Sequence, residues 1–442
     1  MCPDAARRAE LERLCDAGDA DGVCDALQAG GLPQDLRARA WACVLRADAP
    51  AVDVAAAARG DHAERTTVER DVARALWRFD ATKGWSSKLR QKRRRSLARV
   101  IHAAFARAKG SAVYYQGFHD VAEVALLVAG FDRERRALAL AEALLAQRFG
   151  DAAKPSGFGD VSTALRLLAP LLFAADAELA GHVFADREGF ELVEGGIWGL
   201  AWVLTWFAHD VDDVDQLAQI WDALLAGTRQ APAFALYVAV ALVVDAREDL
   251  LRCARDDDGG APLLFQKLSR LAAQPRSPEQ WNVVLANARR LLGAHPPSLR
   301  LCNRLPRPMR PRFVALADQF RSRDGPTVHM LRSGHSRRSR PEEARPQTVA
   351  PGRRRRRRHG AALDTASTKS GPEPHRTGGA TAPWSLLPSL WGWRAGASAG
   401  VLLAGAAAAL ASQIVGPEAT EALLAASKQW CLDGSLGLFL QS

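Results

Sequence analysis

The sequence lacks the ligand patterns of a metal site and the spacing of a disulfide framework. Its seven cysteines are scattered along 442 residues, without a CxxC pair or a His/Cys ligand spacing. An odd number of scattered cysteines predicts reduced thiols that face the cytosol. A Gly-rich loop ending in Lys-Ser/Thr is also missing. The chain is therefore not expected to hold a nucleotide in a phosphate loop of its own.

Strand patterns and a secretion signal are missing as well. No stretch alternates apolar and polar residues over the length of a strand, and nothing repeats at a fixed period. Residues 1–10 are charged and lack the apolar core of a signal peptide. Hydrophobic residues make up 48% of the chain, which is ample for a core, and they recur at helical spacing. The sequence therefore predicts an all-α protein without a secretory signal.

The formal net charge of +10 belongs to one segment of the chain. Residues 304–376 hold 19 Lys and Arg against 6 Asp and Glu, so the remainder of the chain is close to neutral. Residues 304–382 are rich in Arg and Pro and lack core-forming periodicity, which predicts a disordered linker. The run Arg353–Arg358 could serve nuclear localisation, nucleic acid or anionic lipid. No aromatic residues are interleaved within this run for base stacking, so a specific nucleic-acid partner is disfavoured.

Amphipathic patterns divide the first 300 residues into helical segments. The first covers 5–29, with breaks expected at Gly18 and Gly22. The next follows Pro33, which suits a first helical turn, and residues 49–65 predict a loop with a short helix. The other predicted helical ranges are 66–79, 97–108, 118–128, 135–150, 160–175, 177–185, 195–207, 216–225, 233–244 and 262–293. The apolar run 195–207 is too short for a membrane span and predicts a buried core helix.

Two segments carry the functional signal, residues 68–74 and 114–120. In the first, Arg74 falls nearly opposite the apolar stripe of a helix, with Asp71 one turn back. In the second, Gln116 lies among aromatic residues before a glycine. Hydrolysis of a nucleotide γ-phosphate requires an arginine to neutralise developing charge and a glutamine to orient the attacking water. The two segments together supply both side chains.

Each of these residues also has a simpler interpretation. Arg74 could be a solvated arginine with Asp71 as its i,i+3 partner. Gln116 could cap or bond a neighbouring backbone group, as many loop glutamines do. Tyr114 and Asp120 are interpreted as structural, one as a half-buried ring and the other as an acid that fixes the loop or a helix start.

The two segments together resemble the IxxDxxR and YxQ motifs of the TBC family, whose members activate GTP hydrolysis by Rab GTPases. Val68 stands for the isoleucine of the first motif, and Tyr114-Tyr115-Gln116 fits the second without change. The stretch from Gly31-Leu32-Pro33 to Trp41 is similar to the entry of a TBC domain. The resemblance implies a multi-helix TBC domain over residues 28–303, after a helical extension over residues 1–27.

The resemblance implies that Arg74 and Gln116 act in trans on a partner Rab. Asp71, Tyr114, Gly117 and Asp120 are then the supporting residues. GTP and Mg²⁺ would be carried by the Rab, with no metal or cofactor of the chain's own. The chain would be an activator of a GTPase in vesicle traffic, and not a stand-alone hydrolase.

One alternative is a catalytically silent TBC fold that acts as a membrane-anchored Rab-binding scaffold. The intact Arg74 and Gln116 argue against it. Another is a nucleic-acid-binding protein that works through its arginine-rich segment, which the missing aromatics disfavour.

The last part of the chain predicts a membrane anchor. Residues 395–415 carry no charge, and as a helix they match a hydrocarbon core of roughly 30 Å. Arginines precede this stretch, so the positive-inside rule puts the N-terminal part in the cytosol and leaves 416–442 as a short tail. Gly396-xxx-Gly400 allows a homodimer through the span, although the pattern is common. The resemblance implies a location at the endoplasmic reticulum or Golgi membrane. The alternative is a soluble Ala-rich helix.

Overall fold

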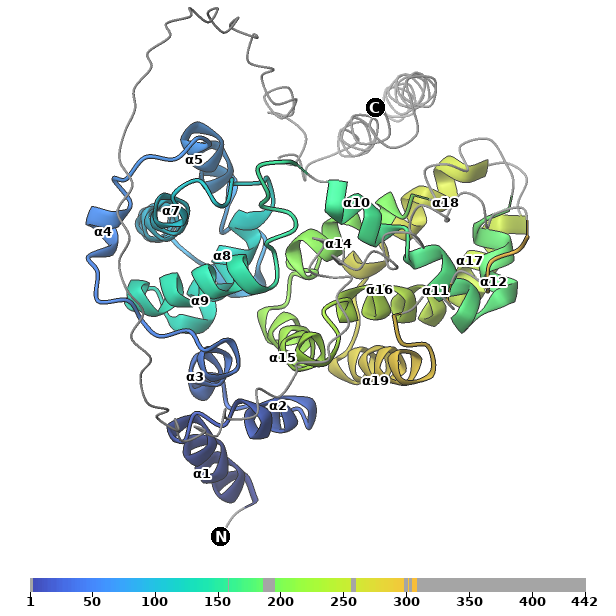
Figure 1. The fold of residues 1–442 in the computed structure, drawn as a ribbon, viewed down its shortest axis with the longest axis horizontal. Coiled ribbons are helices and arrows are strands. Elements are labelled where there is room, and N and C mark those ends of the chain that lie inside the picture. The colour runs from blue at the N-terminus through green and yellow to red at the C-terminus, as the bar shows by residue number, and fades with distance from the viewer. Residues whose placement is uncertain are drawn as a thin grey trace, which may run out of the picture. The chain divides into compact units, whose positions relative to one another are not determined.

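The computed structural model describes residues 3–157, 159–185, 195–255, 260–297, 301 and 304–307, all of which belong to one unit. Every regular element in these ranges is an α-helix or a 3-10 turn (Figure 1), so the predicted all-α class is confirmed there. The linker predicted beyond residue 307, the span predicted over 395–415 and the tail 416–442 lie outside the described residues. Within the described ranges, no helix has the length and apolar character needed to cross a bilayer.

The first half of the described chain supplies nine helices. They are α1 Pro3–Asp16, α2 Ala20–Gln28, α3 Gln34–Leu45, α4 Val54–Ala57, α5 Arg65–Arg74, α6 Asp80–Lys83, α7 Ser87–Ala108, α8 Phe118–Ala129 and α9 Glu134–Gln147. The predicted short helix within 49–65 is confirmed as α4. The long helix α7 packs against α4, α5, α8 and α9 (Figure 1).

The second half continues with further short and long helices. They are α10 Gly159–Leu165, α11 Leu168–Ala175, α12 Ala177–Val183, η1 Ile197–Gly199, α14 Leu200–Thr205, α15 Val214–Gln230, α16 Phe234–Asp245, α17 Arg247–Arg255, α18 Gly260–Ser269, η2 Leu271–Ala273 and α19 Pro278–Ala294. Helix α16 is apolar on all sides and buried along nearly its whole length, because α11, α14, α15 and α19 pack around it. Leu305, inside the predicted linker, is also buried, so the core reaches past residue 303.

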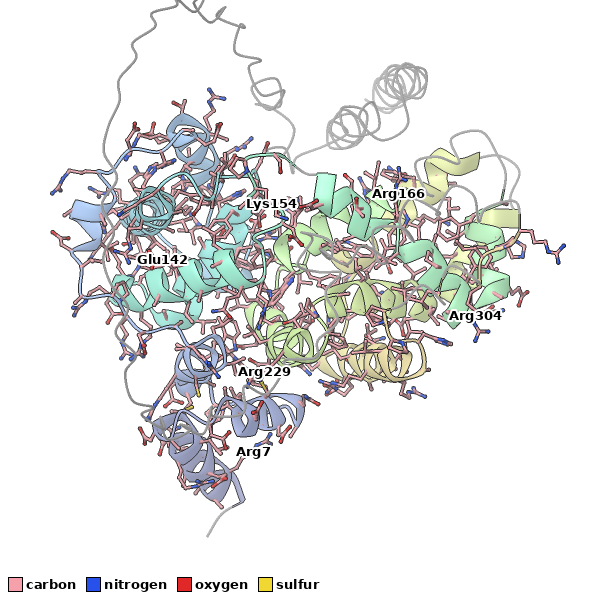
Figure 2. The ribbon with its side chains drawn as sticks, viewed as in Figure 1. Arg7, Glu142, Lys154, Arg166, Arg229 and Arg304 are labelled. Carbon is pink, nitrogen blue, oxygen red and sulfur yellow. The ribbon has the colours of Figure 1, made fainter. Side chains whose placement is uncertain are left out.

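Side-chain hydrogen bonds and ion pairs join the first half of the described chain to the second half. Arg37 of α3 and Trp41 both donate hydrogen bonds to Asp222 of α15, at 3.1 and 2.6 Å, and both charged side chains are buried. Burial raises the pKa of Asp222 to about 6, against the opposing effect of Arg37. Arg229 of α15, labelled in Figure 2, pairs with Asp21 of α2 at 2.8 Å. These contacts fix the N-terminal helices against α15.

The predicted break at Gly18 is confirmed and the one at Gly22 is wrong. Gly18 lies between α1 and α2 with a φ of +64°. Gly22 lies in the first turn of α2, where its N–H donates to the side chain of Asp19 at 3.0 Å. A side-chain oxygen at the N-cap satisfies a helix donor that would otherwise be unpaired, so α2 starts before this glycine.

Two predicted helices end early. The helix predicted over 66–79 stops at Arg74, and Leu76 adopts a left-handed φ of +62°. The predicted core helix 195–207 is buried, as expected, but consists of η1 and the short α14. It ends where Trp206 and Phe207 have φ values of +48° and +66°. After Arg74, the N–H of Leu76 donates to the distant side chain of Glu123 at 2.9 Å. The N–H groups of Trp206 and Phe207 instead donate to the nearby carbonyl of Trp202.

Candidate functional site

The two segments of the sequence motif meet where α5 packs against α7 and α8 (Figure 1). Arg74 is the last residue of α5, and Gln116 lies in the loop between α7 and α8. The early end of α5 places Arg74 at the edge of the packed helices. Its side chain keeps 32% of its surface exposed, while that of Asp71 keeps 2%.

Asp71 is the residue that connects the two segments. One carboxylate oxygen accepts a hydrogen bond from Nη2 of Arg74 at 2.6 Å. The other accepts one from the hydroxyl of Tyr114 at 2.7 Å. Because a single buried carboxylate holds both groups, the arginine of α5 and the loop that carries Gln116 have a fixed relation. Gln116 follows Tyr114 by two residues, a reach of about 7 Å at most.

The simpler interpretations of Arg74 and Gln116 can be compared with this geometry. Arg74 does pair with Asp71, as the simpler interpretation predicts. The Asp71 carboxylate is buried, however, so the ion pair fixes the position of the arginine. Among the described residues, the Arg74 guanidinium uses only one of its nitrogens, which leaves other N–H donors in the exposed part of the side chain. Within the part of the chain that the structure describes, the Gln116 amide has no hydrogen-bond partner and does not cap a backbone group.

The tyrosines fix the loop from the inside. Tyr114 is 5% exposed, so the predicted half-buried ring is a buried one. The hydroxyl of Tyr115 donates to the carbonyl of Leu204 in α14 at 2.8 Å. Burial raises the pKa of both phenols well above the usual value, and the carboxylate of Asp71 raises that of Tyr114 further. Both hydroxyls therefore remain protonated donors at physiological pH.

Gly117 makes the turn between the loop and α8. Its φ is +112°, and a Cβ atom there would lie 3.3 Å from Cγ2 of Thr205. We expect Gly117→Ala to lower the free energy of unfolding by about 1–2 kcal/mol, because an L-residue is strained in this region. Urea unfolding followed by circular dichroism measures the change. Gly84→Ala is the control, since Gly84 has ordinary φ and open space around it. Equal stabilities of the two variants would contradict the expectation.

Asp120 ties the start of α8 to two other segments. It forms a 3.0 Å hydrogen bond with Nδ1 of His209, and its other oxygen lies 3.4 Å from Nη2 of Arg78. Burial by itself would raise the pKa of this carboxyl, but His119, Arg78 and His209 together hold it well below its usual range. Asp120 therefore stays ionised and holds the segment after Arg74, in agreement with its predicted role in fixing a loop.

Three residues that the sequence motifs did not indicate hold the backbone just after Arg74. Glu123 of α8 accepts the N–H of Leu76 at 2.9 Å, and Arg94 of α7 donates to the carbonyl of Ala75 at 3.0 and 2.9 Å. Arg90 donates to the carbonyl of Leu76. Burial raises the pKa of Glu123 to about 8, with Arg78 opposing. A lone glutamate in the apolar run 121–128 was the signal that could have identified Glu123.

The arrangement suits contact with a partner's anionic group. It presents one guanidinium from the exposed edge of α5 and one amide from the loop between α7 and α8, both held by a rigid base. In the described ranges, no group of three or more His, Cys, Asp or Glu could hold a metal ion.

The region that holds these residues is similar to known proteins. The family model described as the Rab-GTPase-TBC domain matches residues 34–251, which include every site residue above. The GTPase-activating protein gyp10 of Schizosaccharomyces pombe is 28% identical over 216 residues, covering 49% of this chain and 52% of that protein. Human TBC1 domain family member 20 is 30% identical over 186 residues, covering 42% of each.

The matched part therefore spans about half or less of the length of these curated relatives. A crystal structure of a Chlamydomonas flagellar RabGAP TBC domain aligns with a TM-score of 0.45 and 18% identity, over 65% of this chain and 95% of that one.

Proposed function

We propose, from the match of residues 34–251 to the family model of the Rab-GTPase-TBC domain, that the protein activates GTP hydrolysis by a Rab-family GTPase. The observation that carries the proposal is the pair of contacts made by Asp71. They hold Arg74 at 2.6 Å and the Tyr114 hydroxyl at 2.7 Å. One rigid base therefore presents a part-exposed arginine and a glutamine that has no hydrogen-bond partner among the described residues.

Arg74 is the arginine finger of the proposed mechanism. Its guanidinium stabilises the negative charge that develops on the transferred phosphoryl group. The hydrogen bond to Asp71 fixes the plane of the guanidinium and leaves further N–H donors for the phosphate oxygens. The Arg74 side chain then loses little conformational entropy when the partner binds.

Gln116 is the second finger. Its amide carries an acceptor and a donor, so it can accept a hydrogen bond from the attacking water and donate one to a phosphate oxygen. Tyr114, Tyr115 and Gly117 hold the loop that carries the amide, and Gln116 itself is part-exposed. The partner GTPase carries GTP and Mg²⁺, and the proposal requires no cofactor on this chain.

The proposal is tested by measuring GTP hydrolysis across a panel of purified Rab GTPases, each with and without the full-length chain. At least one Rab is expected to hydrolyse GTP much faster when the chain is present at catalytic amounts. If a Rab binds the chain but no Rab hydrolyses GTP faster, the chain is a catalytically silent scaffold and not an activator. If no Rab binds and none is accelerated, the proposed function is wrong.

The proposal extends to location: a C-terminal anchor over 395–415 holds the protein at the endoplasmic reticulum or Golgi membrane. Its support is the uncharged stretch itself and the basic residues before it. We expect the full-length chain to resist carbonate extraction from membranes. Ala404→Arg with Ala407→Arg should release it, since each buried arginine costs about 2.5–3.5 kcal/mol.

The matched control for this experiment places the same charges outside the stretch. Ala380→Arg with Ala382→Arg should leave the chain in the membrane fraction. A wild-type chain that carbonate extracts would show that 395–415 is not an anchor.

A further inference from the structure

Trp77 is an exposed aromatic residue three positions after Arg74. Its exposed fraction is 56%, and the other exposed large hydrophobic residues in the described ranges are Leu263 and Val283. Trp77 is thus the one large aromatic side chain that the described surface displays. Large aromatic rings contribute most when they are buried, and Trp is among the residue types enriched at binding hot spots.

The backbone that carries Trp77 is rigid. Leu76, immediately before it, has a φ of +62°, and its N–H is bound by the carboxyl of Glu123 at 2.9 Å. The carbonyl of the same residue accepts a hydrogen bond from buried Arg90. Arg94 binds the carbonyl of Ala75 at 3.0 and 2.9 Å. The direction in which Trp77 leaves the backbone is therefore set by α7 and α8.

The ring itself is also supported from one side. The guanidinium carbon of Arg90 lies 3.6 Å from the ring centroid, and that of Arg94 lies 5.5 Å away. Such cation–π contacts hold the ring in place and leave the remainder of it in solvent. In the described part of the chain, neither arginine forms an ion pair with a carboxylate, and their hydrogen bonds go to backbone carbonyls. The support of the ring is therefore positively charged.

The position of Trp77 relative to Arg74 decides what would cover it. Three residues of chain span at most about 11 Å. A specific protein interface buries about 800 Å² on each partner, equivalent to a disc of roughly 16 Å radius. An interface centred on Arg74 therefore includes Trp77. A rigid aromatic side chain loses little conformational entropy on binding, which is a property of interface hot spots.

We propose that Trp77 is a docking anchor for the partner GTPase and inserts into an apolar pocket with an acidic rim on that protein. The acidic rim follows from the positive charge of Arg94, which is part-exposed beneath the ring, whereas Arg90 is buried. The inference rests on the proposed function, because it identifies the partner as the GTPase on which Arg74 acts. It assigns Trp77 to binding, separate from the chemistry of Arg74 and Gln116.

The test uses the full-length chain with the Rab that it stimulates most. Trp77→Ala should raise the KM for the GTP-loaded Rab about thirtyfold, the equivalent of about 2 kcal/mol for a hot-spot residue, and leave kcat unchanged. Trp77→Phe should restore most of the affinity, since an aromatic ring still fills the pocket. Arg74→Ala should show the opposite pattern, with kcat lost.

Val283→Ala is the matched control. Val283 is 52% exposed and lies on α19, which Figure 1 places well apart from α5 and α7. This variant should leave KM and kcat unchanged. Thermal unfolding of each variant by circular dichroism checks that the fold is intact.

The outcomes separate failure of the inference from failure of the proposed function. A wild-type KM for Trp77→Ala, with wild-type stimulation present, shows that Trp77 is no anchor while the activator function stands. A fall in kcat alone shows that Trp77 supports Arg74 and does not dock the partner. A changed sedimentation coefficient of Trp77→Ala without Rab assigns the ring to a second copy of this chain. If the wild-type chain stimulates no Rab, both proposals are rejected.

Discussion

Arg74→Ala is expected to reduce the stimulated rate of Rab GTP hydrolysis by about 10³–10⁵-fold, the contribution of an arginine supplied in trans. The loss follows from removing the guanidinium that this chain contributes to the developing charge on the phosphoryl group, beside the Mg²⁺ carried by the Rab. Single-turnover hydrolysis of GTP-loaded Rab at saturating activator measures kcat without interference from binding. The Rab alone gives the baseline rate.

Arg74→Lys separates charge from geometry. Lysine keeps the positive charge but lacks the planar fork that bonds Asp71 and the phosphate oxygens together. We therefore expect it to fail nearly as badly as alanine. The domain should remain folded in both variants, because Asp71 keeps its hydrogen bond to Tyr114.

Arg70→Ala is the control for the same helix. Arg70 lies one turn before Arg74 in α5 and is exposed. Its removal lowers the charge of the surface by the same amount and should leave stimulation near wild type. Near-normal stimulation by Arg74→Ala would show that another group stabilises the transition state.

Gln116→Ala should lower stimulated hydrolysis by about 10²–10³-fold, the loss typical of one preorganised hydrogen-bonding group at a transition state. The loss is expected even though the Rab keeps its own glutamine, because the water is oriented by the amide supplied in trans. Gln91→Ala, which removes an exposed glutamine from α7, is the matched control and should have no effect.

A complementary experiment changes the Rab instead. If Gln116 orients the water, a Rab whose own catalytic glutamine is replaced by alanine should still be strongly activated by the wild-type chain. Complete loss with that Rab, together with a harmless Gln116→Ala, would indicate a single-finger mechanism with the glutamine in cis. The pair of experiments thus assigns the water-orienting amide to one protein or the other.

Local sequence was sufficient for the helical class and for much of the candidate site. Amphipathic spacing located most helices, because an apolar stripe with a period of 3.6 residues has few other ways to be buried. The i,i+3 spacing alone puts Asp71 beside Arg74, and the structure has them at 2.6 Å. The glycine after Gln116 indicated a special turn, and Gly117 has the positive φ that such a turn needs.

Tertiary structure decided where those helices end and how the two segments meet. Asp71 and Tyr114 are 43 residues apart, and only the packing of α5 against α7 and α8 brings the carboxylate to the hydroxyl. Helical periodicity continues past Arg74 toward Phe79, yet α5 stops because Glu123, Arg90 and Arg94 bind the backbone of the next two residues. Hydrogen bonds from distant side chains leave no local pattern. The exposed edge that carries Arg74 and Trp77 is thus a product of the assembled core. The sequence alone identified Arg74, whereas the exposure of Trp77 became visible only in the tertiary structure.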